Sequence, residues 1–226
     1  MIARGRGGDK GTVAYTAPFL VYIGLLAVQQ AAGLPLRIFY PLHTLISAAS
    51  IWLVSRRALS LRASRLWASV ALGAAVLLIW IGPDALPGYR HHWLFENRLT
   101  GLAVSAIPPD LRSDRAFLAV CFVRSALVVP ILEELFWRGW LMRWLIDMDF
   151  TAVKIGTYDG LAFWATALLF ASEHGPYWEV GLIAGVIYNW WAVRTKNLAD
   201  CMIAHTATNA LLAAYVVAAG QWQFWL

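Results

Sequence analysis

Two adjacent glutamates, Glu133 and Glu134, lie within a long run of large apolar side chains, and Arg138 follows one helical turn later. Ionisable side chains in apolar segments are costly to bury and by default indicate a functional site. Neighbouring helical residues point about 100° apart, so the two carboxylates cannot face the same direction. Glu134 and Arg138 are spaced i,i+4 and are predicted to pair, which leaves Glu133 available for chemistry. An interfacial salt bridge at a helix end is the structural alternative.

Two further polar clusters interrupt later apolar runs. Glu173 and His174 end one run immediately before a Gly-Pro pair, whereas His205 and Asn209 are spaced i,i+4 on one face of a later helix. Taken singly, a histidine at a helix end is more often an interface residue. Asn and His within membrane helices often serve only to join helices. Together with Glu133, however, these side chains come from three separate apolar segments and predict a polar cavity inside the bundle.

Other polar or small residues near these clusters are interpreted structurally. Gly181, Gly185 and Asn189 form a four-residue ladder, which predicts close helix packing with one interhelical hydrogen bond. Asp200 and Thr208 add polarity to the helix that carries His205.

The elements that must position these side chains are membrane helices. The chain of 226 residues is 60% hydrophobic and only 14% charged, whereas a soluble domain is about 25% charged. So few charges cannot cover a water-facing surface, and the 13 Trp and 8 Tyr suit the headgroup level of a bilayer. The sequence therefore predicts an all-α, polytopic membrane helix bundle, with a large soluble helical protein as the alternative.

Seven apolar segments predict about seven or eight transmembrane helices. The segment 115–146 is too long for one crossing of about 20 residues, and Pro130 within it predicts a kink or a break. The polar stretch 82–114 is predicted to be an external loop with a short surface segment around 93–105. His174 is expected near the far end of its span. The apolar segments lie near residues 13–32, 36–54, 66–82, 115–146, from about 159 to the stretch FASEHGP (170–176), 178–193 and 198–219.

Basic residues indicate how the chain is oriented. They gather in short blocks between apolar segments, as expected for cytoplasmic loops, and not on one face that could bind nucleic acid. We predict an integral protein of the bacterial inner membrane with a cytoplasmic N-terminus and a retained first helix. The blocks consist of Arg4, Arg6 and Lys10, then Arg56, Arg57, Arg62 and Arg65, then Arg194 and Lys196.

Three motifs occur in order in the second half of the chain. EELFWR fits EExxxR, FASEH fits FxxxH, and HTATN fits HxxxN. In this respect the chain resembles the CPBP family of intramembrane proteases, which includes the type II CAAX prenyl endopeptidases, or Ras-converting enzymes. The resemblance covers about residues 115–215, the expected catalytic core of a single domain 1–226, and residues 1–114 supply N-terminal spans and the external loop. It implies that Glu134 and Arg138 are supporting residues.

The resemblance also implies catalytic roles. Glu133 would be the general base, and His174 would hold and activate the attacking water. His205 and Asn209 would form the oxyanion hole. Glu173 departs from the family, because many members carry an apolar residue beside the motif histidine, and this acid could change the pKa of His174.

The implied activity is an intramembrane endopeptidase that cleaves a membrane-associated protein or peptide, with a prenylated CAAX-type substrate as one candidate. The family also contains bacteriocin-immunity and protein-sorting members. The Trp-rich wording of the motifs resembles a bacterial branch linked to exosortase-type (PEP-CTERM) sorting. A non-catalytic immunity or sorting protein therefore stays open, as does an ion or proton transporter, although no inverted repeat is found.

The chemistry is expected to be non-covalent. Cys121 and Cys201 lie outside the motifs, and no GxSxG motif occurs. We favour a cofactor-free mechanism in which Glu133 activates a water. The alternative is a Zn²⁺ site made by Glu133, His174 and His205 with an open position for water. No HExxH motif is present to favour that metal.

Overall fold

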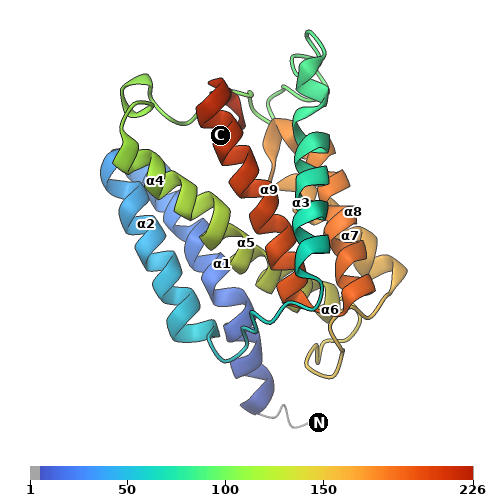
Figure 1. Cartoon of the computed structure of the whole chain (residues 1–226). Coiled ribbons are helices and arrows are strands. Elements are labelled where there is room, and N and C mark those ends of the chain that lie inside the picture. Colours follow the sequence, from blue (N-terminus) through green and yellow to red (C-terminus); the bar gives the residue numbers. More distant parts are fainter. Residues whose placement is uncertain (1–5, 226) are drawn as a thin grey trace.

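The structure is a computed structural model that describes residues 6–225, and the regular elements in this range are all helices. They pack side by side as an all-α bundle (Figure 1), which confirms the predicted fold class. In chain order the helices are α1 (Arg6–Ala32), α2 (Leu36–Ser50), α3 (Leu66–Ile81), α4 (Arg115–Val123), α5 (Val129–Glu134), α6 (Met142–Trp144), α7 (Gly160–Ser172), α8 (Trp178–Thr195) and α9 (Leu198–Ala219).

Among the described residues, five helical segments are long and apolar enough to cross a membrane, fewer than the seven or eight that the sequence predicts. α7 has only 13 residues, which at 1.5 Å per residue span about 20 Å, less than a hydrocarbon core of about 30 Å. α8 has 18 residues but is rich in aromatic and polar side chains. The protein is thus polytopic, with α7 and α8 packed on each other beside the long helices. The five segments are 11–32, 36–55, 66–85, 115–144 and 198–219.

The segment 115–144 stays helical throughout, so of the predicted kink or break at Pro130 the break does not occur. The π-helical stretches Arg124–Val128 and Leu135–Leu141 join α4, α5 and α6 into one rod. Pro130 has no N–H to bond back to Ala126, four residues earlier. Ala126 lies inside the first π-helical stretch, whose wider turn changes the hydrogen-bonding pattern at the position where the proline would otherwise interrupt it.

α9 lies at the centre of the bundle, with α3 and α5 beside it (Figure 1). Its approach to α3 depends on Gly73, because a Cβ atom there would lie 2.3 Å from the carbonyl oxygen of Ala204. At the same contact the hydroxyl of Thr208 donates to the Gly73 carbonyl over 2.9 Å. The helix that carries two of the candidate site residues is therefore held in register by backbone contact.

The loops separate into two groups at opposite ends of the bundle. Residues 56–65 and 145–159 lie at the end where α1 begins, whereas residues 82–114 and the end of α9 lie at the other (Figure 1). The predicted surface segment 93–105 is a series of turns with one isolated bridge between Asn97 and Gly101. This loop covers the end of the bundle at which α7 meets α8.

Candidate active site

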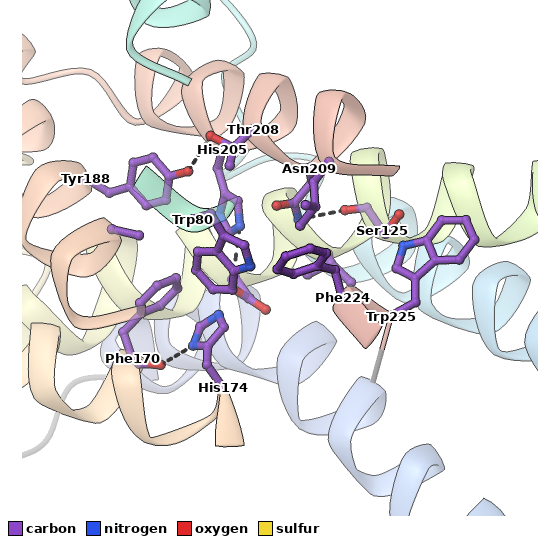
Figure 2. Close-up of a pocket in the computed structure, with 14 residues that line it drawn as sticks. Trp80, Ser125, Phe170, His174, Tyr188, His205, Thr208, Asn209, Phe224 and Trp225 are labelled. Carbon is purple, nitrogen blue, oxygen red and sulfur yellow. Dashed lines mark hydrogen bonds and ion pairs between the residues drawn. The ribbon is translucent and has the colours of Figure 1, made fainter. Parts of the chain in front are cut away.

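A cavity of about 160 Å³ opens between α3, α5, α7, α8 and α9. Glu133, His174, His205 and Asn209 all line it, so the structure brings the four predicted catalytic side chains together. Figure 2 shows the two imidazoles facing this space among aromatic rings. Because a water molecule occupies about 30 Å³, the cavity has room for several of them. The other lining residues include Trp80, Ser125, Phe170, Tyr188, Thr208, Phe224 and Trp225.

Glu134 and Arg138 form a fully buried ion pair behind the cavity, as their spacing predicts. Arg138 Nη1 donates to Glu134 Oε1 over 2.9 Å, and both side chains have no exposed surface. The other guanidinium nitrogens of Arg138 bond to α8: Nε donates to Asn189 Oδ1 over 2.8 Å and Nη2 to the Gly185 carbonyl over 3.2 Å. Phe170 covers one face of the guanidinium at 4.7 Å. A buried pair needs such additional bonds to offset its desolvation.

His205 lies between the two glutamates. Its Nδ1 is 3.0 Å from Glu134 Oε1, and its Nε2 is 3.9 Å from Glu133 Oε2. Because Glu134 also accepts from Arg138, we assign Nδ1–H of His205 as the donor to this carboxylate. Tyr188 stacks on the imidazole with a centroid separation of 5.0 Å, which fixes the plane of the ring. Glu133 remains 13% exposed and faces the cavity.

His174 reaches the same cavity although it follows the end of α7. Its Nδ1 lies 2.8 Å from the Phe170 carbonyl and must donate to it, so Nε2 is left as an acceptor. Trp80 packs edge-on against the imidazole at 5.1 Å, and Gly181 of α8 lies under it. α7 has only 13 residues, so its last turn lies at the depth of the cavity. This is why His174 reaches the cavity although the sequence places it near the far end of its span.

Asn209 lies one turn after His205 on α9 and is held from the opposite wall. Its Nδ2 donates to the Ser125 carbonyl over 2.9 Å, in the π-helical stretch that follows α4 (Figure 2). An amide nitrogen carries two hydrogens, so one N–H remains for a ligand. The oxyanion-hole pair predicted by the HxxxN motif therefore faces the cavity from a single helical turn.

Several residues that support the site were missed or undervalued by sequence reasoning. The Gly181, Gly185 and Asn189 ladder does allow close packing, as predicted, but it also contacts His174 and Arg138 directly. The only sequence signal for this contact is the four-residue spacing. The hydroxyl of Tyr188 donates to Thr208 over 2.7 Å, and no pattern in the sequence links these two residues.

Two acids lie away from the cavity lining. Asp200 accepts hydrogen bonds from the backbone N–H groups of Ser64 and Arg65, so it ties α9 to the basic loop at the other end of the bundle. Glu173 is exposed at the end of α7. Its influence on His174 stays a prediction.

The described residues contain no preformed metal centre. Within residues 6–225, no group of three or more His, Cys, Asp or Glu side chains is arranged to hold a metal ion. Of the three proposed zinc ligands, Glu133 and His205 lie 3.9 Å apart (Oε2 to Nε2), whereas His174 donates from Nδ1 to the backbone and keeps Nε2 free. The zinc alternative stays a prediction.

Residues 115–211 match the family model described as type II CAAX prenyl endopeptidase Rce1-like. This segment is Rce1-like. The match contains all three motifs, so the resemblance to the CAAX-protease family is confirmed, whereas the exosortase-linked branch is not and stays a prediction. The Rce1-like match supports an integral membrane protease that acts on membrane-associated substrates. No curated protein and no solved structure matches the chain significantly.

Proposed function

We propose that the protein is an intramembrane endopeptidase in which Glu133 activates a water for attack on a peptide carbonyl. The observation that carries this proposal is the meeting of Glu133, His174 and His205 around one cavity large enough for water, inside an Rce1-like segment. Glu133 Oε2 is a buried oxygen without a hydrogen-bond partner. A water bound there would satisfy this oxygen and be in place to lose a proton to it.

His174 holds the water from the other side. Its bare Nε2 accepts one hydrogen of the water while Glu133 accepts the other, which orients a lone pair toward the substrate carbonyl. After attack, Glu133 returns the proton to the leaving nitrogen. The peptide bond breaks, and the hydroxyl from water remains on the new carboxyl group.

The developing oxyanion is stabilised by His205 and Asn209. For Nε2 of His205 to donate while Nδ1 bonds to Glu134, the ring must be an imidazolium. Each donor of this kind is worth about 10²–10³ in rate.

Replacement of Glu133 by glutamine tests the proposal. Purified protein in proteoliposomes is given prenylated and unprenylated forms of one peptide, and cleavage products are identified by mass spectrometry. Loss of a general base predicts a fall of about 10²–10⁴-fold in kcat. Asp110→Asn is the matched control, because it makes the same acid-to-amide change at an exposed position.

The outcomes separate the alternatives. Cleavage by Glu133→Gln at the wild-type rate would refute the glutamate mechanism. Activity that is lost on chelation and restored by Zn²⁺ would support the zinc alternative. A preference for the prenylated peptide would identify the substrate class.

A further inference from the structure

A second buried ion cluster lies outside the cavity, where the loop 82–114 meets the turn between α7 and α8. Its centre is Arg90, whose side chain is 6% exposed. Nε and Nη2 of Arg90 donate to Asp84 Oδ1 over 2.9 and 2.7 Å, and Nη1 lies 2.7 Å from Glu179 Oε1 on α8. Burial alone would lower the pKa of Arg90, but the bonds to and charges of these two carboxylates raise it above its ordinary value, so the guanidinium stays charged.

The same guanidinium also holds the turn that follows His174. Nη1 of Arg90 donates to the Pro176 carbonyl over 2.5 Å, and the guanidinium lies 4.1 Å from the ring centroid of Tyr177. The hydroxyl of Tyr177 donates to Asp84 over 3.2 Å, which closes the cluster. We call Arg90, Asp84, Glu179 and the two turn residues the Arg90 clamp.

This turn is bonded to α7 and is also held by the loop. The N–H of His174 donates to the Ala171 carbonyl over 3.1 Å, and that of Tyr177 to the His174 carbonyl over 2.9 Å. α7 ends at Ser172, so His174 lies outside its regular hydrogen bonding. Gly175 has a φ of +52°, and a Cβ atom there would lie 2.8 Å from the Thr100 carbonyl oxygen, so the loop presses directly on the turn. Trp178 adds one bond from its Nε1 to the Leu94 carbonyl over 3.1 Å. The position of His174 therefore depends both on its bonds to α7 and on contacts between its turn and a loop more than 70 residues earlier in the chain.

We propose that Arg90 is a positioning residue that fixes the His174 imidazole in the cavity by clamping the Pro176 carbonyl and the Tyr177 ring. The catalytic part of this inference rests on the proposed function. Arg90 does not line the cavity, and its hydrogen bonds and ion pairs go to Asp84, Pro176 and Glu179, so it acts through the turn. No motif of the sequence includes it.

Arg90→Lys is the decisive variant. Lysine keeps the charge between Asp84 and Glu179, so the fold is retained, but one ammonium cannot reproduce the planar fork that also reaches the Pro176 carbonyl. We expect kcat to fall about 10- to 100-fold, as small displacements of catalytic groups do, with KM changed less than about twofold. Arg98→Lys is the control, because Arg98 is exposed in the same loop.

A double-mutant cycle tests whether the effect passes through His174. In a His174→Ala background, Arg90→Lys is expected to change the residual rate by less than about twofold, because the group that it positions is gone. An equal loss in both backgrounds would overturn the proposal, and so would a wild-type kcat for Arg90→Lys.

Hydrogen exchange measured by mass spectrometry decides the structural part without any activity. Amides of residues 171–181 should exchange faster in Arg90→Lys than in Arg98→Lys, while those around His205 stay unchanged. Unchanged exchange in the turn, or equal acceleration throughout the bundle, would refute the clamp. Absence of any Glu133-dependent cleavage would defeat the proposed function and leave this result intact.

Discussion

The buried pair of Glu134 and Arg138 gives the sharpest test of how the site is held together. Arg138→Met removes the cation and leaves the Glu134 carboxylate inside the bundle without a counter-charge. It also leaves Asn189 and the Gly185 carbonyl on α8 without their donor. Glu134→Gln has the reverse effect, because Arg138 then loses its only carboxylate within 4 Å in the described chain.

The expected magnitudes follow from the burial of both groups. Breaking a buried pair by removing one partner costs about 3–5 kcal/mol of the free energy of unfolding. The double variant, Glu134→Gln with Arg138→Met, carries neither charge. It should therefore lose about the same amount as either single variant, and not the sum of the two, which corresponds to a coupling of about 3–5 kcal/mol.

The assay is reversible unfolding in mixed micelles with increasing sodium dodecyl sulfate, followed by far-ultraviolet circular dichroism. The wild type, the two single variants and the double variant form one cycle under identical conditions. Asp110→Asn, an exposed neutralisation, should stay within about 0.5 kcal/mol of the wild type. If the loss of the double variant equals the sum of the two single losses within about 0.5 kcal/mol, the two groups do not act as a pair.

Two further predictions concern the walls of the site and the loop above it. Gly181→Ala places a Cβ atom 3.0 Å from the ring of His174, so kcat should fall about tenfold. Gly24→Ala, where nothing lies within 4 Å, should leave kcat unchanged, and equal rates for the two variants would contradict a fixed imidazole. Burial raises the pKa of Glu96, but bonds from His91 and a backbone N–H outweigh it and leave the pKa below its ordinary value. Its carboxylate should therefore stabilise the fold at neutral pH. The advantage of wild type over Glu96→Gln in thermal unfolding should shrink as the pH falls through that lowered pKa, and a constant difference would contradict this assignment.

Local spacing was enough to predict the pairings that lie within one helix. The i,i+4 positions of Glu134 and Arg138, and of His205 and Asn209, fix which side chains share a face, and the structure has them so. Polar side chains in three separate apolar segments predicted a common cavity, and the family resemblance added the roles of the individual residues. Nothing in the sequence of α8 indicates that Asn189 is the partner of Arg138. The two residues are 51 positions apart, and their contact depends on how their helices pack.

The remaining differences come from backbone geometry. Pro130 predicts a kink or a break, but the adjacent π-helical stretch accommodates its missing hydrogen bond and the helix continues. The sequence places His174 near the far end of its span because it does not show how short α7 is relative to its neighbours. Arg90 lies in the long polar loop and belongs to no motif. Its role depends on contacts with residues 84, 176 and 179 that only the fold creates.

The adjacency of Glu133 and Glu134 is best understood from the imidazole that lies between them. Neighbouring helical side chains diverge by about 100°, so one carboxylate can enter the ion pair while the other enters the cavity. The two ring nitrogens of His205 lie 3.0 Å and 3.9 Å from these two carboxylates, one on each side. Glu134 thereby fixes the proton on Nδ1, and Glu133 lies next to the nitrogen that would face an oxyanion. A shift of either glutamate by one residue would direct it about 100° away from this ring. The proposed mechanism therefore requires the two acids to be neighbours, one to hold the histidine and the other to activate the water.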